Sequence, residues 1–192
     1  ATYWQPWSTS TNNSQYNPYG STSTNLFDGG VNQGKADWGY NAISNGGNAT
    51  HQWRTLTQAE WTYVFITRST SSGIRYAKAQ VNNINGVILL PDDWSTSYYS
   101  LRSGEDYTSN VISSSDWANG LQSHGAVFLP AAGCRNGTSV NYAGTRGWYW
   151  SSTNSTNGYA CNLSFDSDSV NPWSAGYRNV GGSVRLVQDY NP

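Results

Sequence analysis

The chain has 192 residues, a formal net charge of -1 and only 11% charged residues. It is long enough to bury a core as one domain, and the absence of a basic stripe argues against nucleic acid as a partner. No apolar run approaches the roughly 18 residues that a membrane-spanning helix needs. The 10 Trp and 14 Tyr residues supply large rings that bury much apolar area, which argues against disorder.

A polar composition that is poor in charge and rich in rings is common in exported bacterial proteins, so we expect an extracellular or cell-surface location. The chain opens on Ala1 and contains no Met, so we expect a processed or excised piece. Cys134 and Cys161 are too few to define a redox compartment. The sequence is compatible both with a disulfide between them and with two free thiols.

The first predicted element follows a long polar segment. Residues 1–50 are dominated by Ser, Thr, Asn and Gly and are predicted to form a loop. Thr57 followed by Glu60 matches a capping box, and apolar residues then recur at helical spacing. The sequence therefore predicts a helix over 58–68.

A hairpin is predicted next. Val81 and the apolar run 87–90 are separated by Asn85-Gly86, a pair that favours a tight turn. Because the second run is continuously apolar, we expect its strand to be buried on both faces.

A second helix is predicted over 115–124, since Ser115 can cap its start and Gly125 stands where a C-terminal glycine belongs. The strands predicted after it are 126–129, 148–151, 160–165 and 183–187. This order of elements predicts a single α+β domain over 1–192 with a small, mostly antiparallel sheet.

Groups for catalysis or metal binding are sparse. The histidines lie in loop or helix-end contexts, no Gly-x-Ser-x-Gly surrounds a serine, and no Cys/His spacing fits a metal site. Asp166 and Asp168 are able to hold Ca²⁺, but turn-forming Asp is the simpler interpretation. We therefore predict no enzymatic activity, no cofactor and no metal.

Residues 134–182 combine Trp and Tyr with Ser, Asn and Gly, as antibody binding loops do. Rings give rigid contact area, and small polar groups give adaptable hydrogen bonds. This composition favours a ligand-binding surface; the alternative is that the rings pack a polar β domain. Within this stretch Trp150 and Phe165 fit the core by their strand positions, whereas Trp148, Tyr159, Trp173 and Tyr177 fit the surface.

Residues 36–188 resemble a group of exported Bacteroides-type proteins related to the Fibrobacter major paralogous domain, through "WRTLTQAEWTYVF", "GVILLPDDW", "GAVFLPAAG", "YWSST" and "GGSVRLV". The resemblance implies a C-type lectin-like fold, similar to that of formylglycine-generating enzymes. It does not extend to their activity, which depends on a closely spaced cysteine pair. The Glu-Pro-Asn and Gln-Pro-Asp triplets of Ca²⁺-dependent lectins do not occur either.

Some members of this wider group are variable proteins of diversity-generating retroelements, in which adenine-directed mutagenesis scatters residues over a ligand-binding face. By this resemblance 134–182 is the variable region, and both cysteines are products of variation. Trp148 and Trp173 depart from the pattern, because adenine changes alone do not convert an Asn codon to Trp. The candidate ligand-binding residues are Cys134, Asn141, Tyr142, Arg146, Trp148, Asn154, Asn157, Tyr159, Asn162, Asp166, Asp168, Trp173, Tyr177 and Asn179.

We predict a non-enzymatic ligand-binding or adhesion domain. Its expected partner is a protein or glycan on another cell or on a phage or host surface, and its expected setting is a lipoprotein or a phage particle. Two alternatives stay open: a structural module of a surface lipoprotein or fimbria-like assembly, and an enzyme of the formylglycine-generating type.

Overall fold

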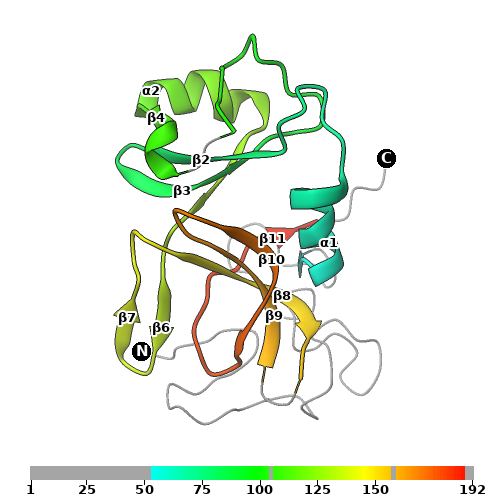
Figure 1. The fold of residues 1–192 in the computed structure, drawn as a ribbon, viewed down its shortest axis with the longest axis vertical. Coiled ribbons are helices and arrows are strands. Elements are labelled where there is room, and N and C mark those ends of the chain that lie inside the picture. The colour runs from blue at the N-terminus through cyan, green and yellow to red at the C-terminus, as the bar shows by residue number, and fades with distance from the viewer. Residues whose placement is uncertain (1–52, 104–105, 157–158, 189–192) are drawn as a thin grey trace.

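The computed structural model describes residues 53–103, 106–156 and 159–188, so the predictions for 1–50 lie outside the described residues. The described part contains two helical segments and four small sheets (Figure 1). The predicted α+β class is confirmed. None of the helices in these ranges is long and apolar enough to cross a membrane.

The first helical segment consists of α1 (Gln58–Thr62) and a π-helical continuation, η1 (Tyr63–Thr67). The Thr57 hydroxyl accepts a hydrogen bond from the Glu60 N–H at 3.1 Å, and the Glu60 carboxylate accepts one from the Thr57 N–H at 2.8 Å. The N–H groups of Thr57 and Glu60, which have no backbone partner at the start of a helix, therefore both donate a hydrogen bond. The predicted capping box and the helix over 58–68 are confirmed.

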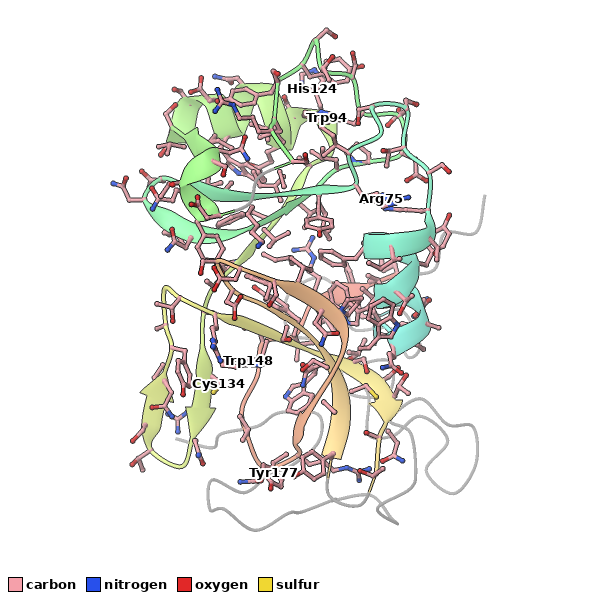
Figure 2. All side chains as sticks on the ribbon, viewed as in Figure 1. Arg75, Trp94, His124, Cys134, Trp148 and Tyr177 are labelled. Atoms are coloured by element: carbon pink, nitrogen blue, oxygen red, sulfur yellow. The ribbon has the colours of Figure 1, made fainter. Side chains whose placement is uncertain are left out.

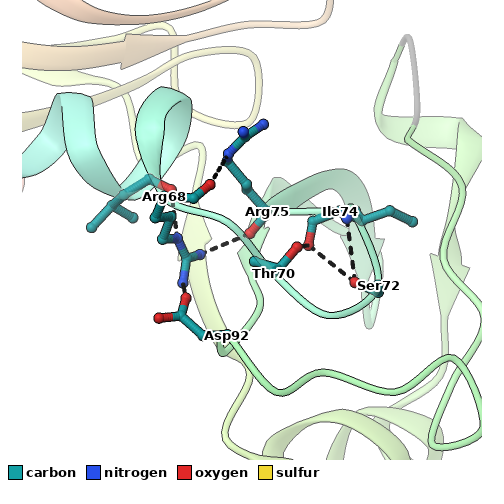
Figure 3. A network of polar contacts seen from close by, with 7 residues as sticks. Arg68, Thr70, Ser72, Ile74, Arg75 and Asp92 are labelled. Atoms are coloured by element: carbon teal, nitrogen blue, oxygen red, sulfur yellow. Dashed lines mark hydrogen bonds and ion pairs between the residues drawn. The ribbon is translucent and has the colours of Figure 1, made fainter.

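Arg68 ties the end of this segment to two other parts of the chain (Figure 3). Its Nη1 donates to Asp92 Oδ1 at 2.8 Å, and its Nε donates to the Val64 carbonyl at 2.8 Å. Its Nη2 donates to the Arg75 carbonyl at 3.0 Å, and Arg75 Nε donates back to the Arg68 carbonyl. The loop between the helix and the first long strand is therefore fixed by side-chain bonds to backbone carbonyls.

The larger sheet has the order β4-β2-β3-β5. Its strands are β2 (Tyr76–Val81), β3 (Ile84–Leu89), β4 (Val111–Ile112) and β5 (Val127–Pro130). All neighbours are antiparallel except β2 and β4, which are parallel. As predicted, the centre of β3 is buried.

The β2–β3 hairpin turns at Asn82-Asn83, so the prediction of a turn at Asn85-Gly86 is wrong. Both turn residues have positive φ, 50° and 63°, which a two-residue hairpin loop of the primed type requires. Asn85-Gly86 lies inside β3, where a Cβ on Gly86 would stand 2.4 Å from the Leu129 carbonyl oxygen. The glycine permits the close approach of β5 rather than a turn.

The second helical segment is formed by α2 (Ser114–Asp116), η3 (Trp117–Leu121) and η4 (Gln122–His124). Its N-cap is Ser113, whose hydroxyl accepts from the Asp116 N–H at 3.1 Å; the predicted cap, Ser115, lies inside the helix. Gly125 ends it in the left-handed conformation at φ 85°, as predicted.

The second sheet has the order β10-β9-β8 and is antiparallel throughout. Its strands are β8 (Gly147–Asn154), β9 (Tyr159–Phe165) and β10 (Val170–Tyr177). The sequence predicted β8 and β9 but not β10. Proline is rare in strands because it has no N–H to donate to a neighbouring strand. Pro172 lies at a bulge on the edge strand, where that hydrogen bond is not needed.

Three short pieces complete the fold. They are the hairpin β6 (Cys134–Asn136) with β7 (Ser139–Asn141), the pair β1 (Arg54–Thr55) with β11 (Leu186–Val187), and the 3-10 turn η2 (Tyr107–Ser109). The strand predicted over 183–187 is shortened to β11, and Ser183 makes only an isolated bridge to β8.

Two clusters of buried side chains form the core. One lies between the larger sheet and the second helical segment and includes Ile88 and Leu121. The other joins α1 to both sheets, through Trp61, Leu129 and Leu163. Because the second cluster contains residues of all three elements, the two sheets form a shared core rather than separate units.

Candidate ligand-binding site

Three predicted site residues contact one another where the loop after β7 enters β8: Tyr142 and Arg146 of the loop and Trp148 of β8, here called the Arg146 cluster. The rings of Tyr142 and Trp148 meet edge to face, with centroids 5.5 Å apart. The Arg146 guanidinium carbon lies 5.2 Å from the Tyr142 centroid and 6.0 Å from the Trp148 centroid. These distances are within the range of cation–π attraction.

The loop that carries the cluster is fixed by its own backbone. The Tyr142 carbonyl accepts the Arg146 N–H at 3.0 Å, and the Gly133 N–H donates to the Arg146 carbonyl at 2.7 Å. A Cβ on Gly133 would stand 2.1 Å from the Asn141 carbonyl oxygen, so this close approach requires glycine. The β6–β7 hairpin therefore returns Tyr142 to the start of β8.

Asp166 adds a carboxylate to the cluster. Its Oδ2 lies 3.5 Å from Arg146 Nε, and its Oδ1 accepts the N–H groups of Asp168 at 3.0 Å and Ser169 at 2.9 Å. Partial burial acts to raise the pKa of Asp166, but these donors and the Arg146 charge outweigh it and lower the pKa below its ordinary value. Asp166 therefore forms the β9–β10 turn and stays ionised beside Arg146.

Tyr159 and Tyr177 form a second aromatic group. They face each other across β9 and β10, with centroids 4.3 Å apart. The neighbouring Arg178 is fully buried; its Nε donates to the Tyr159 carbonyl at 3.0 Å, and its Nη2 bonds the Asn154 side-chain oxygen. This group thus includes a buried guanidinium and three of the predicted site residues.

The ring of Trp148 and the ring of Tyr159 lie on opposite faces of the β8–β10 sheet. Trp148 pairs with Ser164 of β9, and Tyr159 lies five residues earlier on the same strand. Successive residues of a strand point to alternate faces, and five residues span roughly 17 Å. In Figure 2 Trp148 lies beside Cys134 at the β6–β7 hairpin, and Tyr177 lies at the far end of the sheet. The predicted rings therefore do not form one continuous surface.

The other candidates differ in exposure. Trp173 is 54% exposed on β10 and Asp168 is exposed in the turn, whereas Asn162 and Asn179 are buried. Asn162 lies inside β9, so its side chain is below the surface that a ligand reaches. Cys134, Asn141 and Asn154 are half-buried. Asn157 lies outside the described residues.

Both cysteines are free thiols, which decides between the two alternatives left open by the sequence. Cys161 is buried in β9, and Cys134 is half-buried in β6. Burial raises the pKa of each thiol, so neither is poised as a nucleophile at neutral pH.

Sequence reasoning missed three residues around these groups: Lys78, Tyr107 and Arg178. Lys78 is buried in β2, as are its strand neighbours Ala77 and Ala79. A single lysine among small apolar residues of a strand indicates a buried charge that needs a partner. Nothing in the local pattern of Tyr107 or Arg178 marked them.

Residues 96–187, just under half of the chain, match the family model of a domain of unknown function (DUF8237). The match begins before η2 and ends at β11, so it contains both aromatic groups but not α1, β2 or β3. No curated protein and no solved structure matches the chain.

Proposed function

We propose that the chain is a non-enzymatic binding domain for a protein or glycan ligand, and that the Arg146 cluster is the centre of its contact surface. The observation that carries this proposal is the Arg146 guanidinium, held against two rings while its side chain is 47% exposed. Among residues 53–103, 106–156 and 159–188 its side chain donates no hydrogen bond, and its Nε faces Asp166, so its Nη N–H groups are available to a ligand.

The chemistry of the cluster suits recognition. Binding energy concentrates in a few Trp, Tyr and Arg side chains that become desolvated, and rigid rings lose little entropy on contact. Tyr142, 56% exposed, offers an apolar face, and Arg146 offers donors for acceptor groups of a ligand. Asp166 holds Arg146 from the side and lowers the cost of ordering it on binding.

The remaining parts of the proposal rest on the sequence resemblance. They are a C-type lectin-like fold, a bacterial cell-surface or extracellular location, and diversification of 134–182 by a retroelement. Among the described residues Trp173 and Tyr177 make no ring contact with the Arg146 cluster, and they are proposed as a secondary surface. A structural module of a surface assembly is the competing function.

Alanine variants tested on a glycan array and a random peptide library distinguish these functions. Ligands selected with the wild-type domain are expected to bind Tyr142→Ala and Arg146→Ala more than tenfold more weakly. Tyr63→Ala is the matched control, because Tyr63 is 55% exposed on η1, away from the cluster. Equal binding by all three variants would contradict the site, and a library without any binder would favour the structural module.

A further inference from the structure

We propose that Lys78 and Tyr107 are positioning residues for the Arg146 cluster. Each reaches from outside the variable region, 134–182, to a backbone carbonyl next to one partner of the Arg146–Asp166 ion pair. This inference rests on the proposed function, because it assigns what holds that surface in its binding geometry.

Lys78 acts on the Asp166 side. It is buried in β2 of the larger sheet, and its Nζ donates to the Ser167 carbonyl at 2.7 Å. Burial lowers the pKa of its ammonium below the ordinary value, and the charges of Asp166, Asp168 and Asp106 oppose this effect. A buried ammonium is stable only with such partners, so the β9–β10 turn is bound to the larger sheet at this point.

Tyr107 acts on the Arg146 side. It is buried in η2, and its hydroxyl donates to the Thr145 carbonyl at 3.0 Å. Thr145 directly precedes Arg146. Burial, together with the Asp166 charge, raises the pKa of Tyr107 to about 12, so the hydroxyl keeps its proton.

The hydrogen bonds from Lys78 to Ser167 and from Tyr107 to Thr145 are here called the two tethers. They constrain the residues next to the 3.5 Å contact between Arg146 Nε and Asp166 Oδ2. When a tether is lost, the loop or the turn gains freedom, and a ligand must order it on binding. One hydrogen bond of this kind corresponds to a loss of affinity of roughly threefold to tenfold.

The test is the ¹⁵N NMR signal of the Arg146 Nε–Hε group, assigned by its disappearance in Arg146→Lys. In the wild type this signal is expected to be shifted by the rings and to be ordered. Tyr107→Phe removes one oxygen atom and should move the signal toward that of free arginine, with a lower order parameter. Lys78→Met should do the same, and Lys78→Arg, which keeps a donor, should restore it.

Tyr149→Phe is the matched control. Tyr149 is buried in the same core cluster, and its hydroxyl donates to the Pro130 carbonyl at 2.9 Å. If Tyr107→Phe leaves the Arg146 signal unchanged, or Tyr149→Phe alters it equally, positioning is wrong. If the signal changes but the affinity for the selected glycan or peptide does not, the positioning stands and the proposed function fails.

Discussion

The rings of 134–182 differ in burial because of the residues that lie against them. Trp150 is 2% exposed, and a Cβ on Gly176 or Gly182 would stand 3.4 Å or 3.1 Å from its ring atoms. Glycine at both positions lets the chain pass directly over the indole. Trp173, on the bulged edge strand β10, has no such cover.

Truncation should separate these two roles. Trp150→Ala is expected to lower the free energy of unfolding by roughly 3–5 kcal/mol, because it leaves a cavity in the core. Trp173→Ala is expected to change it by about 1 kcal/mol or less, as at other surface sites. Urea denaturation of both variants checks this. Equal destabilisation would mean that Trp173 belongs to the core.

Asp166 makes the cluster sensitive to acid. The pKa of Asp166 is lower in the folded state than in the unfolded chain. Its contribution to stability is therefore complete at pH values above the ordinary pKa of Asp and is lost as the pH falls through the pKa of the folded state. Asp166→Asn keeps an acceptor but no charge. Between about pH 5 and pH 2 the wild type should therefore lose more stability than this variant, as measured by thermal melts. Parallel curves would contradict the assigned role.

At the scale of elements, positive φ at two consecutive asparagines sets the β2–β3 hairpin. Asn83, at φ 63°, occupies the position at which Asn-Gly hairpins carry glycine. Asn83→Gly should therefore stabilise the domain by up to about 1 kcal/mol, since glycine adopts this conformation without steric cost. Asn85→Gly, within β3, is the control and should destabilise it by roughly 0.5–1 kcal/mol. Differential scanning calorimetry distinguishes the two; destabilisation by Asn83→Gly together with stabilisation by Asn85→Gly would contradict the turn.

The helices were predictable from sequence because their signals are local. A capping box marks the first helix, and Gly125 marks the end of the second. The hairpin turn was misplaced because Asn85-Gly86 has the composition of a turn, while its location inside β3 follows from the approach of β5. The strand β10 was missed because Pro172 is tolerated only at an edge, and edge position is a property of the whole sheet.

At the scale of the whole molecule, the second core cluster includes side chains of α1 and β3, which lie outside the residues matched by the family model. Residues 96–187 supply Leu129 and Leu163 but not Trp61 or Val87, which pack in the same cluster. A fragment of 96–187 is therefore expected to lack a cooperative melt in circular dichroism, whereas the full chain melts in one transition. A sharp melt of the fragment would contradict a shared core.

The composition of the candidate site was predictable, but its geometry was not. Composition indicated a binding surface within 134–182, and the resemblance supplied Tyr142, Arg146 and Trp148 as candidates. Their separation from Tyr159 and Tyr177 depends on strand register, which places Trp148 and Tyr159 on opposite faces of one sheet. The tethers come from Lys78 and Tyr107, whose contacts span 89 and 38 residues, and no local pattern encodes such distances.

The most direct test of the Arg146 cluster as the recognition surface is a saturation scan of the displayed domain. The library is sorted once for display level and once for binding to the glycan or peptide selected by the wild type. Substitutions that abolish binding but keep display are expected at Tyr142, Arg146 and Trp148, with weaker losses at Asp166. If such substitutions instead gather on the β2–β5 sheet, or around Tyr159 and Tyr177 alone, the Arg146 cluster is not the binding surface.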